Sequence, residues 1–138
     1  MLSIEICNID HVVLRVRDVA ASKRFYCDVL GCKVERESEA LGLHQLRAGT
    51  SLIDLVPVAG PLGRLGGVGP GTEGRNVDHV ALALAAFDAT AIAAHLRSHG
   101  IEPGEVGDRY GASGMGPSMY IRDPDGNVVE LKGPAHPS

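Results

Sequence analysis

The sequence predicts an α+β fold built from two tandem copies of one module. Two apolar segments, one with a histidine and one with an acid, each occur twice and in the same order. The residues IDHVVL at 9–14 recur as VDHVAL at 77–82. A single acid inside an apolar run also occurs twice, in SLIDLV at 51–56 and in NVVELK at 127–132. These segments have the length and the β-branched composition of short strands.

One helix is predicted in each copy, after the first repeated segment. Asp18 and Asp88 are placed to cap the start of an amphipathic or alanine-rich stretch. Gly31 and Gly100 follow these stretches and suit the left-handed position that ends a helix. The predicted helices cover residues 19–30 and 89–99.

Three short strands are predicted after each helix, so each copy reads strand, helix, strand, strand, strand. The sequence DPDG at 123–126 predicts a tight turn between the last two strands. The second copy is longer by a glycine-rich segment at 104–116, which we interpret as a flap. The predicted strands cover residues 9–16, 33–37, 42–48 and 51–57 in the first copy, and 77–84, 101–103, 117–122 and 127–132 in the second.

The 138 residues are predicted to form a single domain that contains both modules. The first module covers 8–58 and the second covers 76–133. Residues 59–75 are rich in Gly and Pro and match no phosphate-binding pattern, so we interpret them as the linker.

The composition excludes several classes of function. With 13 Lys and Arg against 17 Asp and Glu, the net charge is −4 and no basic run occurs, so we expect no binding to nucleic acid or membranes. The three cysteines lack CxxC spacing, and the sequence has no signal-peptide pattern and no apolar stretch of membrane-spanning length. We therefore expect a cytoplasmic protein whose partner is a small molecule.

Two His–acid pairs carry the predicted chemistry. His11 and His79 are equivalent positions of the repeated segments IDHVVL and VDHVAL. Asp54 and Glu130 are equivalent positions of the repeated segments SLIDLV and NVVELK. If the copies pack about a pseudo-twofold axis, these four side chains meet, and their two negative charges suit a divalent metal. Nickel, cobalt, zinc, iron and manganese are the expected ions, and a metal-free hydrogen-bonded cluster is the alternative.

The doubled His–acid pattern, together with FYCDVLG at 25–31 and YIRDPDGNVVEL at 120–131, resembles the vicinal-oxygen-chelate superfamily. This superfamily includes glyoxalase I, extradiol dioxygenases and the fosfomycin- and bleomycin-resistance proteins. The resemblance covers about residues 8 to 133 and implies two βαβββ modules that form an open, cup-shaped mixed sheet around one divalent metal.

The ligand positions are most similar to those of glyoxalase I, which has two ligands in each module. His11, Asp54, His79 and Glu130 match that four-ligand set, although Asp54 is shorter than the glutamate found there. Extradiol dioxygenases and fosfomycin-resistance enzymes use a His-His-Glu set, which would leave Asp54 unused.

The resemblance also implies substrate-binding positions. Arg15 and Arg75 fall where glyoxalase I holds the carboxylates of glutathione, which suggests glutathione as a cosubstrate, and an arginine fork suits a carboxylate. Met115 and Tyr120 fall at positions that line the substrate pocket. Asp108 stands at the flap position where a lysine is expected. Family members of this length often form homodimers, which we expect here.

The predicted function is that of a metal-dependent, glyoxalase-type lyase or isomerase acting on a small substrate with vicinal oxygens. The metal would stabilise an enediolate, while Glu130 or Asp54 would move the proton. Two alternatives stay open: a metal-free, bleomycin-resistance-type protein that sequesters a ligand, and an Fe(II) extradiol dioxygenase.

Overall fold

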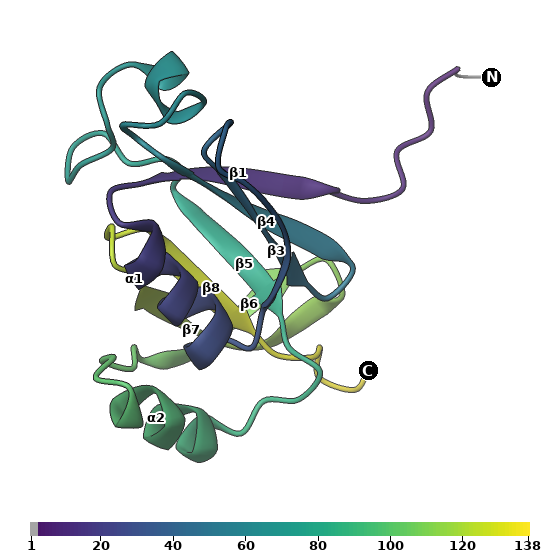
Figure 1. Cartoon of the computed structure of the whole chain (residues 1–138). Helices are drawn as coiled ribbons and strands as arrows, with labels where there is room; N and C mark the ends of the chain where they lie inside the picture. Colours follow the sequence, from purple (N-terminus) through teal and green to yellow (C-terminus); the bar gives the residue numbers. More distant parts are fainter. Residues whose placement is uncertain (1–2) are drawn as a thin grey trace. The chain divides into compact units, whose positions relative to one another are not determined.

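The computed structural model describes residues 3–138, which divide into two compact units, one ending at Gly69 and the other covering Pro70–Ser138. Figure 1 shows the elements of both units in chain order. None of the helices within residues 3–138 has the length and apolarity needed to span a membrane.

The first unit has the predicted order of one strand, one helical segment and three strands. The helical segment is an α-helical turn that continues as a π-helical turn. A short 3-10 turn, η2 (Gly63–Gly66), lies in the segment that was predicted to be the linker. The other elements are β1 (His11–Val16), α1 (Val19–Lys23), η1 (Arg24–Val29), β2 (Lys33–Ser38), β3 (Leu43–Ala48) and β4 (Ser51–Pro57).

The sheet of the first unit has the order β1-β4-β3-β2, with β1 parallel to β4 and the other neighbours antiparallel. Alternate residues of its strands form the apolar core on one face, as the period of two predicts. α1 contacts β4, and η1 adds Phe25 and Tyr26, whose rings meet edge to face at 4.9 Å. The buried strand residues of this core are Leu14, Val16, Leu46, Ile53 and Leu55. The opposite face carries the polar side chains of the sheet beside Val13, Leu52 and the buried Val56.

The second unit repeats this order, with the sheet arranged as β5-β8-β7-β6. β5 is parallel to β8, and the other neighbours are antiparallel. Its core combines Met119, Ile121, Val129 and Leu131 of the strands with Leu96 of the helix. The elements are β5 (His79–Ala83), α2 (Ala89–Ser98), β6 (Val106–Gly111), β7 (Gly114–Arg122) and β8 (Val128–Lys132).

The predicted helix ends are confirmed. The side chains of Asp18 and Asp88 each accept a hydrogen bond of 3.1 Å from the backbone N–H three residues later. Gly31 and Gly100 have φ values of +83° and +74°, in the left-handed region that a residue with a Cβ rarely adopts.

The prediction of a flap at 104–116 is wrong, because most of this segment forms the hairpin of β6 and β7. The predicted strand at 101–103 is also absent, and the ladder begins only at Val106. Pro103 has no N–H to donate to a ladder, and a Cβ atom at Gly104 would lie 2.2 Å from the carbonyl oxygen of Tyr120. In the hairpin itself, the hydrogen-bonded pairing of β6 with β7 outweighs the low strand propensity of the glycines in β6.

The predicted turn between β7 and β8 is confirmed. Gly126 has φ +83°, and its N–H donates to the carbonyl of Asp123. The buried Asp123 carboxylate accepts from the backbone N–H of Asp125 and Asn127 and from the side-chain amide of Asn127. The turn fixes where β8 begins, and therefore where Glu130 lies.

Candidate functional site

The first His–acid pair lies on the polar face of the first sheet. Val13 is the register partner of Asp54, so His11 and Asp54 share one face of the parallel pair β1 and β4. Nε2 of His11 lies 4.0 Å from Oδ2 of Asp54. Nδ1 of the same ring contacts a carboxylate oxygen of Asp10 at 2.7 Å. The histidine is thus held at one nitrogen and faces the acid with the other.

Asp54 is a buried carboxylate with unused hydrogen-bonding capacity. Asp54 is 3% exposed, and its Oδ1 has no hydrogen-bond partner among residues 3–138. Oδ2 accepts one bond of 3.2 Å from Nε2 of Gln45, which lies directly opposite on β3. A buried carboxylate oxygen without a donor is costly and indicates a cation or a proton at this atom.

The second His–acid pair repeats this arrangement in the other unit. Nε2 of His79 lies 3.2 Å from Oε1 of Glu130, which is 6% exposed. Nδ1 of His79 contacts a carboxylate oxygen of Asp78 at 2.7 Å, the same distance as in the first unit. Ala81 is the register partner of Glu130, so the two pairs hold equivalent places in their sheets.

The aspartates that precede the histidines decide the chemistry of the rings. When Nδ1 donates to the carboxylate of Asp78, a neutral ring presents the Nε2 lone pair to Glu130. Two acceptors cannot face each other at 3.2 Å without a metal ion or a proton between them. The pKa of His11 is raised, first by its hydrogen bond with Asp10 and then by the charge of Asp54. The hydrogen bond with His79 lowers the pKa of Asp78.

The donor chemistry of both pairs fits a divalent metal. Metal-bound histidines usually donate their second N–H to a carboxylate, as Asp10 and Asp78 allow here. Two atoms each about 2.1 Å from one ion and at right angles to each other lie about 3 Å apart. The His79–Glu130 separation matches this spacing, and the His11–Asp54 separation is longer. Within residues 3–138 no three His, Cys, Asp or Glu side chains form one group.

Tyr120 lies beside the second pair. It is directly opposite Glu130 on β7, and its ring meets the ring of His79 edge to face at 5.6 Å. The guanidinium of Arg109 lies 4.4 Å from the centroid of the Tyr120 ring. Tyr120 holds the place that Gln45 holds in the first unit, so the two pairs have different neighbours.

Arg15 lies on the same strand face as His11, but its guanidinium donates to backbone carbonyls. Its partners include the carbonyl oxygens of Gly67 at 3.2 Å and Val68 at 3.0 Å. A Cβ atom at Gly66 would lie 2.4 Å from the guanidinium, so the 59–75 segment closes over this side chain. The contacts attach the segment to β1, and the carboxylate-binding role of Arg15 stays a prediction.

Arg75 and Met115 are placed differently from Tyr120. Nη2 of Arg75 lies 3.8 Å from Oδ2 of Asp78, so Arg75 reaches the acid that holds His79. Met115 is exposed and lies near the start of β7. It is five residues from Tyr120, about 17 Å along the strand and on the opposite face. The structure therefore does not bring Met115 to the second pair.

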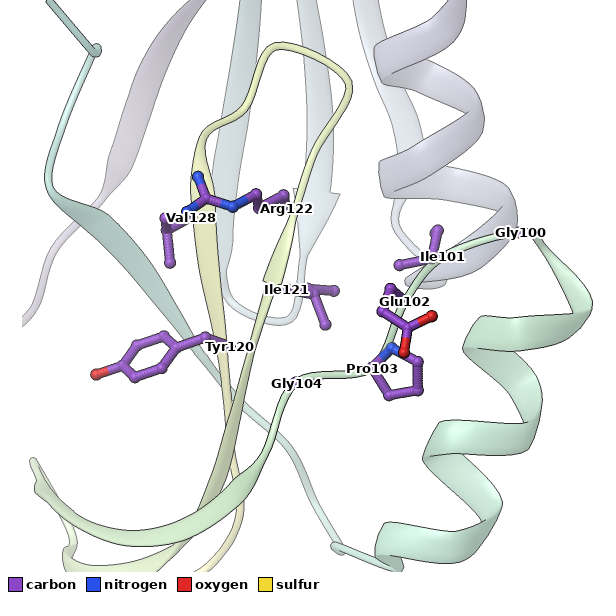
Figure 2. Close-up of a pocket in the computed structure, with 9 residues that line it drawn as sticks. All are labelled: Gly100, Ile101, Glu102, Pro103, Gly104, Tyr120, Ile121, Arg122 and Val128. Atoms are coloured by element: carbon purple, nitrogen blue, oxygen red, sulfur yellow. The ribbon is translucent and has the colours of Figure 1, made fainter. Parts of the chain in front are cut away.

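A cavity of about 420 Å³ opens where residues 100–104 pass β7. Figure 2 shows Ile121 pointing toward Ile101 and Pro103, whereas the ring of Tyr120 points to the other side of the strand. Tyr120 also lines this cavity, so it borders both the cavity and the ring of His79.

Four residues of these sites were missed in the sequence. Asp10 and Asp78 were visible as the residues before both histidines in the repeated IDH and VDH, but no role was given to them. Gln45 and Arg109 become recognisable only through strand register, because each lies on the strand next to the acid or ring that it contacts.

A family model described as the Glyoxalase/Bleomycin resistance protein/Dioxygenase superfamily matches residues 8–131. The chain belongs to this superfamily. The predicted resemblance is confirmed, and so is the predicted α+β class with its two four-stranded mixed sheets.

Two curated proteins are similar in sequence. Biphenyl-2,3-diol 1,2-dioxygenase 3 of Rhodococcus globerulus is 32% identical over 128 residues, which make up 88% of this chain and 60% of that protein. The chain therefore spans less than two thirds of that relative. Virulence protein STM3117 of Salmonella typhimurium is 30% identical over 131 residues, 89% of this chain and 81% of that protein.

Two solved structures have a similar fold. The crystal structure of virulence protein STM3117 has a TM-score of 0.73 and 28% identity, and covers 96% of this chain and 100% of that one. TnmS3, an antibiotic binding protein from Streptomyces sp. CB03234, has a TM-score of 0.67 and 21% identity, and covers 96% and 99% of the two chains. The second likeness concerns the fold alone.

Proposed function

We propose that this member of the superfamily is a divalent-metal-dependent enzyme of the glyoxalase type, a lyase or isomerase whose small substrate carries two adjacent oxygens. The observation that carries the proposal is the arrangement of aspartate, histidine and buried acid, present in both units with the same Nδ1 contact of 2.7 Å. His11, Asp54, His79 and Glu130 would hold the ion. A cation between a buried acid and a histidine lone pair would stabilise both groups.

The bound metal would supply a Lewis acid that holds the two oxygens of the substrate. The chain's own residues do the rest. Asp10 and Asp78 keep both rings in the tautomer whose Nε2 is free. Glu130 takes a proton from the substrate carbon and returns it to the neighbouring carbon, a role that typically contributes about 10²- to 10⁴-fold in rate.

The metal is tested by titrating chelator-stripped protein with Co²⁺ and following visible absorption and heat. We expect one ion for each set of the four residues His11, Asp54, His79 and Glu130. His79→Ala should lose this binding. His136→Ala should leave it unchanged, because His136 pairs with Asp108. If the wild-type protein binds no Co²⁺, the metal-dependent enzyme is excluded and the ligand-sequestering protein takes its place.

The catalytic role is tested with hemithioacetals of glutathione and of other thiols, which also decides whether glutathione is the cosubstrate. Glu130→Gln should retain substrate binding and lose turnover in a metal-loaded sample. Full turnover in this variant would contradict the role of Glu130.

The proposed homodimer has its own test. Chains carrying only His11→Ala and chains carrying only His79→Ala are mixed after mild dissociation. Recovery of metal binding means that each ligand set is completed by two chains, whereas no recovery means that one chain supplies all four residues.

A second candidate is an Fe(II) extradiol dioxygenase, favoured by the 32% identity with a biphenyl-diol dioxygenase. It would use His11, His79 and Glu130 and leave Asp54 without a metal bond. Oxygen consumption with a catechol in the Fe²⁺-loaded protein, unchanged in Asp54→Asn, would favour it over the glyoxalase-type enzyme.

A further inference from the structure

Lys132 is a buried cation that has no acidic partner in the described part of the chain, residues 3–138. It is 7% exposed, and its ammonium donates to the carbonyl oxygen of Gly133 at 3.1 Å. No carboxylate within residues 3–138 lies within 4.0 Å of Nζ. An ammonium group has three N–H donors, so two of them have no acceptor in this part of the chain. Burying such a group is costly unless an anion compensates it.

The hairpin of β6 and β7 is shaped around this side chain. A Cβ atom at Gly111 would lie 3.3 Å from Cε of Lys132, and one at Gly116 would lie 3.0 Å from Nζ. The lysine therefore crosses the sheet over two positions that have no side chain. The glycines that lowered the strand propensity of this segment leave the space that the cation uses.

A second cation lies on the same face. Nη1 of Arg109 donates to the carbonyl and the hydroxyl oxygens of Ser118, at 3.0 and 2.7 Å. Nε and Nη2 of Arg109 donate to no atom of residues 3–138, and no carboxylate lies within 4.0 Å of the guanidinium there. Ser118 is fully buried and is the register partner of Lys132. Because its oxygen accepts from Arg109, its hydroxyl hydrogen is free to donate.

We propose that Lys132, Arg109 and Ser118 form a binding site for an oxyanion, a carboxylate or a phosphate group of a small molecule. The three side chains supply an ammonium, the open edge of a guanidinium and a hydroxyl donor to one face of the second sheet. Charged and hydroxyl donors of this kind are the groups that recognise such anions. In a chain whose net charge is −4, two neighbouring cations without acidic partners mark a local site.

The site lies beside the second His–acid pair. Lys132 and Glu130 are two residues apart on β8 and share a face, with Cα atoms about 7 Å apart. Arg109 reaches the same pair through the ring of Tyr120. This part of the inference rests on the proposed function: the substrate would be an anion whose charged group lies next to its vicinal oxygens.

The test is a calorimetric titration of chelator-treated protein with inorganic phosphate and, separately, with acetate, at an ionic strength kept constant with chloride. We expect one of the two anions to bind with a stoichiometry of one. Lys132→Met should weaken that binding at least tenfold, and Arg109→Gln should weaken it several-fold. The controls are Lys33→Met and Arg122→Gln, which remove exposed cations and should leave the affinity unchanged.

Melting temperatures and circular dichroism keep the test interpretable. Lys132→Met should melt at or above the temperature of the wild-type protein without anion, because it removes a buried charge, and the bound anion should raise only the wild-type temperature. If Lys132→Met does not fold, Arg109→Gln carries the test. The inference is overturned if the wild-type protein binds neither anion. It is also overturned if the Lys132→Met and Arg109→Gln variants bind the anion as tightly as the wild-type protein does.

Failure of this inference is distinguishable from failure of the proposed function, because the titration contains no metal. Lys132→Met should bind Co²⁺ as the wild-type protein does. A protein that binds phosphate or acetate through Lys132 but takes up no Co²⁺ contradicts the metal-dependent enzyme and retains the oxyanion site.

Discussion

Nε2 of His79 lies 3.2 Å from Oε1 of Glu130, a spacing at which two neighbouring ligands of one ion are found. The corresponding distance between His11 and Asp54 is 4.0 Å. The shorter acid in the first unit accounts for this difference, since aspartate has one methylene less than glutamate. Each unit thus provides one histidine and one carboxylate, but the carboxylate lies farther from the histidine in the first unit.

Lengthening the acid of the first unit should strengthen metal binding. We expect Asp54→Glu to bind Co²⁺ at least as tightly as the wild-type protein, because the added methylene brings the carboxylate toward Nε2 of His11. Asp54→Asn removes the charge and should weaken binding by about tenfold or more. Titrations of both variants check this, and tighter binding by Asp54→Asn than by Asp54→Glu would contradict Asp54 as a ligand.

The aspartates that hold the histidines should matter for metal affinity even though both are exposed. Replacing Asp78 with Asn removes the carboxylate that accepts from Nδ1 of His79. Loss of such a partner typically lowers metal affinity by about 10- to 100-fold. Asp28→Asn, which changes an exposed acid of η1, serves as the control for net charge. Equal affinities in the two variants would assign Asp78 no part in the site.

The turn before β8 should be a main determinant of stability. Asp123→Ala removes the acceptor of three hydrogen bonds and leaves the side-chain N–H of the buried Asn127 without that acceptor. We expect the free energy of unfolding to fall by about 2–4 kcal/mol. Asp123→Asn keeps one oxygen acceptor and should lose less. Urea unfolding measures both variants, and a neutral Asp123→Ala would show that the turn forms without these bonds.

Cysteine reactivity should follow burial. Burial raises the pKa of Cys32 to about 11, so its thiol stays protonated and unreactive at neutral pH. Cys7 is exposed. Alkylation of the folded protein with iodoacetamide should therefore modify Cys7 first and Cys32 last, as followed by peptide mass spectrometry. Cys7→Ser should lose the fast phase, and rapid labelling of Cys32 in that variant would contradict its burial.

The stability of the first unit should depend on pH through Glu37. The pKa of Glu37 is held below its ordinary value of 4.5, first by His44 on the facing strand and then by the ammonium of Lys23. A carboxylate with a lowered pKa stabilises the fold fully above its ordinary pKa, and this contribution is lost as the pH falls through the folded pKa. The free energy of unfolding should thus fall less steeply below about pH 4.5 in Glu37→Gln than in the wild-type protein. Identical slopes would show that the ion pairs do not contribute.

Much of the fold follows from the sequence because the chain repeats itself. The doubled segments located β1, β4, β5 and β8 to within two residues, since apolar runs and alternation are local signals. The cap aspartates and the left-handed glycines located the helix ends for the same reason. β6 was missed because its glycines favour a loop, and only the pairing with β7 makes it a strand.

The candidate site was predictable in part. His11, Asp54, His79 and Glu130 were singled out because each pair repeats, and the structure places each histidine beside its acid. Their metal-binding role stays a prediction. Arg109 and Lys132 could not be found in this way, because neither has a counterpart in the first copy and both depend on cross-strand contacts. Local patterns predict elements, whereas a site assembled from several strands requires their register.

Gln45 and Tyr120 hold the same place beside the two acids, yet one donates a hydrogen bond and the other presents a ring. A duplicated unit allows this difference, because a contact can change in one half while its counterpart in the other half is kept. Descendants of such a duplication would diverge in specificity by substitutions in β7 and its hairpin. The corresponding strand of the first half, β3, would change more slowly, since Gln45 there keeps a buried acid bonded.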